Sequence, residues 1–265
     1  MMTTDTQTRA VGQLTLVPHG EVTILRIDRP EKLNALTAAF WTDLQTVLTQ
    51  LENDRRTRVI VLTGAGDKAF CAGGDIAGFA QLETLAQKHA FQAVAMQGFA
   101  ALENCSLPVI AAVNGLALGG GCELTLACDI VIASERAQFG MPESALGLVP
   151  GYGVLRAPDV IGRQMTKLMV MAGERLTAQQ ALAAGLVQKV VEHAALLETA
   201  IALAERIAAN SPLAHSVGKR LINRTIDRSG FDYSVEALTV LQSADDAREG
   251  ISAFLEKRKA RFVLR

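Results

Sequence analysis

The sequence has few of the features that mark secreted, membrane or disulfide-rich proteins. Only four cysteines occur among 265 residues, and no two of them form a CxxC pair, so neither a disulfide framework nor a cysteine zinc site is indicated. No apolar run is long enough to span a bilayer without charged or glycine interruptions, and no basic-then-apolar leader is present. We therefore expect a cytoplasmic protein with reduced thiols and no membrane partner.

The sequence also lacks an excess of charge of either sign. It contains 26 Lys and Arg against 27 Asp and Glu, a formal net charge of −1, which gives no electrostatic reason to expect nucleic acid as a partner. One basic stretch, residues 257–261, is most simply a solvated helix face. The four histidines (His19, His89, His193 and His215) are isolated and show no metal-ligand spacing, so no metal site is predicted.

The apolar segments predict an α/β protein. Short strands alternate with helices, which favours crossover connections of right-handed sense. Strands are expected at residues 11–17, 21–28, 59–63, 108–113 and 130–133, and helices at 37–53, 81–103 and 121–127. After residue 162 the pattern is mostly helical, with one short strand near 187–191.

The chain is long enough for one large domain with an appendage. We expect residues 1–12 to form a flexible N-terminus, 13–200 an α/β core and 201–265 a helical region. A helix predicted over 232–260 has an apolar stripe that can pack on the core or on another subunit.

Two glycine-rich turns each link an apolar strand to a helix. The first is Ala69-Phe-Cys-Ala-Gly-Gly-Asp-Ile76, and the second is Leu118-Gly-Gly-Gly-Cys-Glu123. Such turns direct backbone N–H groups at one spot, and glycine lets the backbone approach a ligand closely. Two of them can form an oxyanion hole, a set of donors that stabilises negative charge on a carbonyl oxygen. Neither turn has the ending of a P-loop or the GxGxxG spacing of a dinucleotide fold.

Two glutamates accompany these turns. Glu123 ends the second turn, and Glu143 follows in Phe139-Gly-Met-Pro-Glu143. Alone, Glu123 is explained as a carboxylate favoured at a helix N-terminus, and Glu143 as a surface loop residue. Together with the two turns, they suit an enzyme that holds a carbonyl oxygen and moves protons beside it.

At this point the chain resembles the crotonase family, the enoyl-CoA hydratase/isomerase group. The resemblance covers about residues 13–262, in order and with similar spacing. The matching segments are the two glycine turns, the Glu143 segment, Arg29-Pro-Glu-Lys-Leu-Asn-Ala-Leu36, Pro150-Gly151 and Arg248-Glu-Gly-Ile-Ser-Ala-Phe-Leu-Glu-Lys-Arg-Lys259. It implies a spiral of ββα units, with residues 201–265 building a homotrimer or a hexamer of paired trimers.

The resemblance implies an acyl-CoA thioester as ligand and, most closely, an enoyl-CoA hydratase. Coenzyme A is then part of the substrate, and no separate cofactor is expected. By position, the N–H groups of Gly74 and Gly120 form the oxyanion hole, and Glu123 and Glu143 exchange protons with the added water and the α-carbon. Gly151 is expected to donate its N–H to that water.

The resemblance also implies substrate contacts. Those expected to line the adenine and pantetheine of coenzyme A are Lys32, Leu33, Ala72, Asp75 and Ile76. Phe254 and Lys257 match positions that reach a neighbouring subunit's coenzyme A. Phe79, Leu82, Phe91 and Met96 lie in or near the segment expected to wall the acyl pocket, although such residues are also ordinary core.

One segment departs from the family pattern. Pro150-Gly-Tyr-Gly-Val-Leu-Arg156 stands where many relatives have PGAGGTQRL. Tyr152 replaces a small residue, and we expect it to narrow the acyl pocket or to reposition the water. This departure leaves open another reaction on an acyl-CoA, namely isomerisation, dehydration of an unusual acyl group or decarboxylation. A non-catalytic thioester-binding or RNA-binding scaffold is a further alternative.

Overall fold

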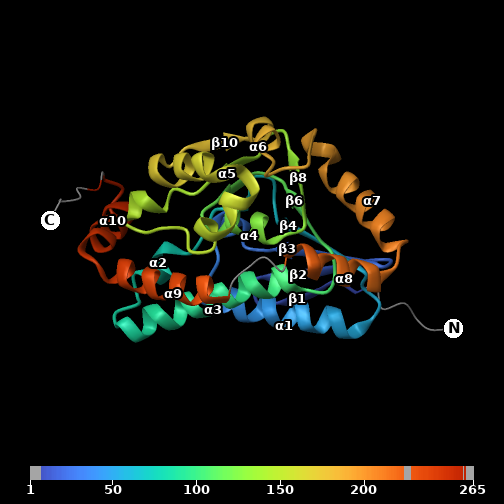
Figure 1. The fold of residues 1–265 in the computed structure, drawn as a ribbon, viewed down its shortest axis with the longest axis horizontal. Coiled ribbons are helices and arrows are strands. Elements are labelled where there is room, and N and C mark those ends of the chain that lie inside the picture. The colour runs from blue at the N-terminus through green and yellow to red at the C-terminus, as the bar shows by residue number, and fades with distance from the viewer. Residues whose placement is uncertain (1–6, 224–227, 259, 261–265) are drawn as a thin grey trace.

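Two β-sheets form the centre of the molecule, and helices cover them (Figure 1). The computed structural model describes residues 7–223, 228–258 and 260. The larger sheet has seven strands in the order β1-β2-β3-β4-β6-β8-β11. Their bounds are β1 Arg9–Val11, β2 Leu14–His19, β3 Val22–Ile27, β4 Val59–Gly64, β6 Val109–Val113, β8 Ile130–Ser134 and β11 Lys189–Val191.

The larger sheet is parallel from β3 to β11 and antiparallel from β1 to β3. β4 and β6 are buried along their whole length, as expected of parallel strands with both faces covered. The strands predicted at 59–63, 108–113 and 130–133 are therefore confirmed. The prediction of a flexible N-terminus is wrong for Arg9–Val11, which pairs with β2; residues 1–6 of that segment lie outside the described residues.

Alternate side chains of the parallel strands pack on opposite faces of the sheet. One face, with Leu25, Leu62 and Val113, packs in the same core as α1 (Ala38–Asp54) and α3 (Leu85–Asn104). The other face, with Ile24, Val61 and Ile110, packs on α7 (Leu196–Ala208). The period of two in a strand produces this division. The helix predicted at 37–53 is confirmed, and Thr37 caps it by accepting from Phe40 N–H.

The smaller sheet has four strands in the order β10-β9-β7-β5. Their bounds are β5 Ala69–Cys71, β7 Leu116–Leu118, β9 Gln138–Gly140 and β10 Arg175–Thr177. None was predicted as a strand in its own right, because three residues are too few to show a period in the sequence. β5 and β7 pair in parallel, so the two glycine turns that follow them leave the sheet side by side.

The remaining helices surround the smaller sheet and the C-terminal region. They are α2 Ile76–Phe79, α4 Gly120–Ala127, α5 Gly153–Ala172, α6 Ala178–Ala184, α8 Pro212–Asn223, α9 Arg228–Ser243 and α10 Asp245–Leu255, with 3-10 turns η1 Pro30–Lys32, η2 Glu143–Leu146 and η3 His193–Ala195. The single helix predicted over 232–260 is wrong, since Ala244 is extended (ψ 159°) and separates α9 from α10. None of the helices in the described ranges is long and apolar enough to cross a membrane.

Two buried asparagines hold the loop that joins β4 to β5. The Nδ2 of Asn34 donates to the carbonyl oxygens of Ala65 (3.0 Å) and Ala69 (2.8 Å). The Nδ2 of Asn114 donates to the carbonyl oxygen of Gly66 at 2.8 Å. Asn34 has a positive φ of 58°, a conformation that asparagine tolerates better than most residues. These side chains therefore fix the backbone just ahead of the first glycine turn.

We expect Asn34→Ala to lower the free energy of unfolding by about 3 kcal/mol. It removes the side-chain donor of the Ala65 carbonyl oxygen and leaves that of Ala69 with only the longer bond from Asn114 at 3.3 Å. Denaturant titration measures this change. Asn104→Ala is the matched control, since the Asn104 side chain is exposed and bonds only within its own helix; its cost is about 1 kcal/mol or less. Equal losses for the two variants would show that the Asn34 bonds do not stabilise the fold.

Candidate active site

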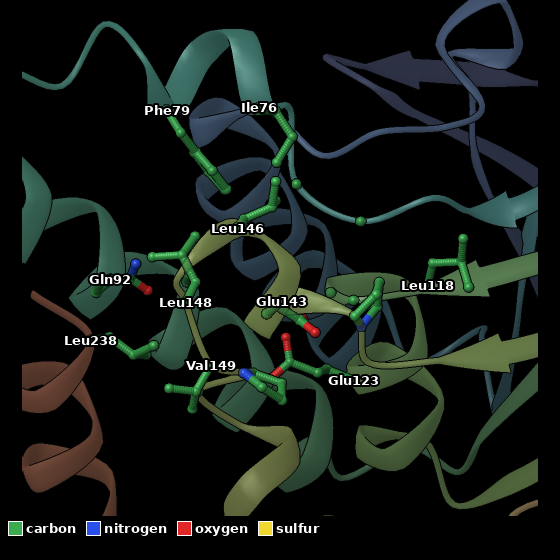
Figure 2. A pocket seen from close by; sticks show the side chains of 18 of the residues that line it. Ile76, Phe79, Gln92, Leu118, Glu123, Glu143, Leu146, Leu148, Val149 and Leu238 are labelled. Carbon is green, nitrogen blue, oxygen red and sulfur yellow. The ribbon is translucent and has the colours of Figure 1, made fainter. Parts of the chain in front are cut away.

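A pocket of about 260 Å³ lies where the two glycine turns meet α3, α9 and the segment 142–151. Figure 2 shows Glu123 and Glu143 in it, with apolar side chains around them. Its wall includes Gly74, Gly120 and Gly151 beside the two glutamates. The structure therefore brings together all five residues that the sequence suggested for catalysis.

The two glycine turns approach each other as closely as backbones can. A Cβ atom on Gly121 would lie 2.0 Å from the carbonyl oxygen of Cys71, and one on Gly73 would lie 3.0 Å from that of Leu118. Real Cβ atoms do not make contacts as short as 2.0 Å, so Gly121 cannot have a side chain. Gly73 also has a φ of 104°, which glycine adopts without steric cost.

The amides of Gly74 and Gly120 face this pocket without an internal acceptor. On either side of Gly74, Leu36 N–H donates to Gly73 and Asp75 N–H donates to Leu36. Gly120 begins α4, where the first N–H groups of a helix have no partner in the helix. Within the described part of the chain, neither amide donates a hydrogen bond. The two N–H groups are thus available to one ligand oxygen.

Glu123 is held as a buried carboxylate in the first turn of α4. Its Oε1 accepts from the backbone N–H groups of Tyr152 (2.8 Å) and Gly153 (2.7 Å). Burial raises the pKa of Glu123 from 4.5 to about 7, although the two N–H donors act in the opposite direction. Hydrogen bonds to the charged form oppose the cost of burial, so this group ionises close to neutral pH.

Glu143, at the start of η2, lies in a different environment. Its Oε2 is buried and has no hydrogen-bond partner among the described residues. Burial, and then the negative charge of Glu123, raise the pKa of Glu143 well above its ordinary value. Two carboxylates this close disfavour double ionisation. The pair therefore holds one proton near neutral pH. Glu143 is its better carrier, because one backbone N–H stabilises its anion against two at Glu123, and the charge of Glu123 disfavours its ionisation.

The side chain of Tyr152 lies in the core and is not part of the pocket wall. Its side chain is fully buried and stacks on Phe99, with ring centroids 4.8 Å apart. Its hydroxyl lies against Glu103 and Arg156, which form an ion pair of 2.6 Å. The expectation that this side chain narrows the acyl pocket is wrong. The residue directs its N–H to Glu123 and its ring into the core, so it contacts the site through the backbone.

The other predicted binding residues divide into two groups. Ala72, Ile76 and Phe254 line the pocket. The remaining ones, Lys32, Leu33, Asp75 and Lys257, are not part of its wall. Asp75 instead forms an ion pair of 2.7 Å with Arg29, whose hydrogen bond and charge lower the pKa of Asp75.

Most of the residues expected to wall an acyl pocket lie in the wall of this one, and their contact with an acyl chain stays a prediction. Phe79, Phe91 and Met96 line the pocket, whereas Leu82 does not. Trp41, on α1, also belongs to the wall. Gly153, whose N–H binds Glu123, was not predicted as a site residue. A backbone donor cannot be recognised from the type of residue in the sequence.

The cysteines of the glycine turns are poor nucleophiles. Burial raises the pKa of Cys71 to about 12 and that of Cys122 further, so neither is a thiolate at neutral pH. Both are free and buried, so they act as small side chains that fill space in the turns. Within the described ranges, no group of three or more His, Cys, Asp or Glu side chains is arranged to hold a metal ion.

Two N–H donors beside a buried carboxyl pair define an enzyme that stabilises an oxyanion and transfers protons next to it. A family model for enoyl-CoA hydratase/isomerase matches residues 19–264. The chain belongs to this family, and it has the predicted crotonase-like α/β fold.

Similar proteins cover nearly the whole chain. The short-chain-enoyl-CoA hydratase of Clostridium acetobutylicum is 38% identical over 94% of this chain and 97% of its own length. The 2,3-dehydroadipyl-CoA hydratase of Escherichia coli is 38% identical over 95% of this chain and 99% of its own. A crystal structure of carnitinyl-CoA hydratase from Mycobacterium avium superposes with a TM-score of 0.85 at 37% identity, covering 97% of this chain and 100% of that one.

The raised pKa of Glu123 predicts a pH-dependent stability. The folded state keeps the Glu123 proton to a higher pH than the unfolded state, so stability falls as pH rises from 4.5 through about 7. Glu123→Gln cannot ionise and still accepts the two N–H bonds. We expect it to exceed the wild type in free energy of unfolding by about 2–3 kcal/mol at pH 8, and by much less at pH 5.

Denaturant titrations at several pH values measure this difference. Glu135→Gln, at an exposed position, is the control and should follow the wild type at every pH. A Glu123→Gln curve parallel to that of the wild type would mean that Glu123 ionises with an ordinary pKa.

Proposed function

We propose that this protein hydrates 2-enoyl-CoA thioesters reversibly to 3-hydroxyacyl-CoA. The observation that supports this most directly is the pair of buried glutamates in one pocket with the unpaired amides of Gly74 and Gly120. The hydratases among the similar proteins are consistent with the same reaction. Isomerisation or decarboxylation needs no second carboxyl group placed to activate water, so the pair favours hydration.

In the proposed mechanism, the thioester oxygen accepts from the N–H groups of Gly74 and Gly120. Glu123, stabilised as an anion by two backbone donors, takes a proton from water while the water oxygen bonds to the β-carbon. The alkene electrons move onto the thioester, whose oxygen becomes negative between the two amides. Glu143 then gives its proton to the α-carbon, and the proton taken by Glu123 passes to Glu143 to restore the starting state.

The remaining substrate contacts stay predictions. Gly151 lies in the pocket wall, next to the Tyr152 amide that holds Glu123, which supports its proposed N–H bond to the water. Coenzyme A is proposed to extend past Ala72 and Ile76 toward Lys32 and Leu33. No separate cofactor is required by the mechanism, because coenzyme A arrives with the substrate.

We further infer a homotrimer or a hexamer of paired trimers. On α8, Leu213, Val217 and Leu221 recur every four residues and therefore share one face, and they are 72%, 38% and 57% exposed. An exposed apolar face of this kind is commonly covered by another subunit. A cytoplasmic location is also proposed, supported by four free cysteines.

We expect Glu123→Gln and Glu143→Gln each to lower kcat by about 10²–10⁴, because each removes one proton-transfer group. KM should change little, since the glutamine keeps the shape of the pocket. The loss of enoyl-thioester absorbance on adding crotonyl-CoA measures turnover. Glu135→Gln is the control, with activity like the wild type. Near-full activity in either active-site variant would exclude the proposed role of that residue.

The oxyanion hole can be tested by removing one N–H group. Gly120 is the first residue of α4, a position where proline is tolerated because its missing N–H has no helical partner. We expect Gly120→Pro to lower kcat by about 10²–10³. Gly120→Ala retains the N–H, and its Cβ would lie 3.4 Å from Leu36, so it should keep most of the activity. Equal losses in the two folded variants would argue against a donor role.

A further inference from the structure

The acyl pocket contains a neutral polar side chain that the hydration mechanism does not use. Gln92, on α3, lines the pocket together with Leu148 and Leu238. Figure 2 places these three side chains at the side of the pocket away from Leu118, with Glu123 and Glu143 between the two sides. Gln92 therefore lies to one side of the glutamate pair, with the apolar side chains of Leu148 and Leu238 beside it.

The Gln92 amide is only partly satisfied by the protein. Its Nε2 donates to Gln242 Oε1 on α9 at 3.4 Å, which is long for a hydrogen bond. Its Oε1 accepts no hydrogen bond from any described residue. Gln242 is 2% exposed, and its Nε2 is buried without a partner in the same part of the chain. Two amides with unused donor and acceptor capacity thus meet at the pocket wall.

An unsatisfied amide in an apolar wall penalises an apolar ligand. A hydrocarbon tail that covers Gln92 removes water from the amide and returns no hydrogen bond. A ligand hydroxyl can both accept from an amide N–H and donate to a carbonyl oxygen. The wall therefore discriminates by the chemistry of the acyl tail.

The charges around the pocket favour a neutral tail over a carboxylate. Among the described residues of the wall, Arg175 is the one cation, and it packs beside Gly140 and Leu118. Leu118 lies across the glutamates from Gln92 in Figure 2. A carboxylate beside Gln92 would therefore be buried without a cation, and near two acidic side chains, which is costly.

We propose that Gln92 is a specificity residue that recognises a neutral hydrogen-bonding group, such as a hydroxyl, on the tail of the acyl chain. This inference rests on the proposed function for the identity of the thioester. The substrate class is then a hydroxylated medium-length enoyl-CoA.

Binding of saturated thioesters tests the proposal without requiring turnover. Isothermal titration calorimetry compares hexanoyl-CoA with 6-hydroxyhexanoyl-CoA, and octanoyl-CoA with 8-hydroxyoctanoyl-CoA. In the wild type, we expect the hydroxylated member of at least one pair to bind about tenfold more tightly. Gln92→Leu should remove or reverse this preference, whereas Gln97→Leu, at an exposed position on the same helix, should retain it.

Two further measurements separate recognition from a structural role. Gln242→Leu breaks the contact between α3 and α9 but keeps Gln92. If both variants weaken every thioester equally, the pair only joins the helices and the proposal is overturned. The proposal is also overturned if the wild type binds the two members of each pair equally. It is overturned as well if the wild type binds adipyl-CoA, whose tail ends in a carboxylate, more tightly than hexanoyl-CoA and 6-hydroxyhexanoyl-CoA.

Crotonyl-CoA hydration is followed in parallel in the wild type and in the exposed-site control Gln97→Leu. We expect equal rates in the two proteins. Loss of hydration in the wild type contradicts the proposed function, while the binding preference still tests Gln92.

Discussion

The contact between two polypeptide backbones is the constraint on which the site depends. β5 and β7 pair in parallel, and the turn after β7 passes so close to Cys71 that Gly121 has no room for a Cβ atom. This contact brings the amides of Gly74 and Gly120 to one pocket. It also fixes where α4 begins, and Glu123 lies within the first turn of that helix.

A buried carboxyl pair has a cost in stability that the chemistry requires. The protein lowers this cost at Glu123 with two backbone donors, and Tyr152 contributes one of them while its ring is fixed in the core by Phe99. Glu143 receives no such donor at Oε2, so the two acids differ although their side chains are identical. Environment, rather than residue type, assigns the roles of base and acid. The acyl wall belongs to other elements, α3 and α9, and can set selectivity without altering this pair.

Much of the fold could be predicted from local sequence pattern. β4, β6 and β8 are apolar runs of five or six residues, long enough to show burial on both faces. The strands of the smaller sheet have three residues each, and so short a segment forms a strand only because its neighbours supply hydrogen bonds. The break at Ala244 was not predicted, because apolar residues recur at helical spacing on both sides of it.

The sequence by itself determined the chemical groups of the site. The glycines at 74 and 120 and the glutamates at 123 and 143 lie in motifs whose spacing indicates an oxyanion hole and a proton-transfer pair. Only the tertiary structure decided that Tyr152 faces the core, because the direction of a side chain in a turn depends on what packs against it. It also decided the contact of Gln92 with Gln242, 150 positions apart. No local pattern encodes such a contact, because packing of α9 on α3 creates it.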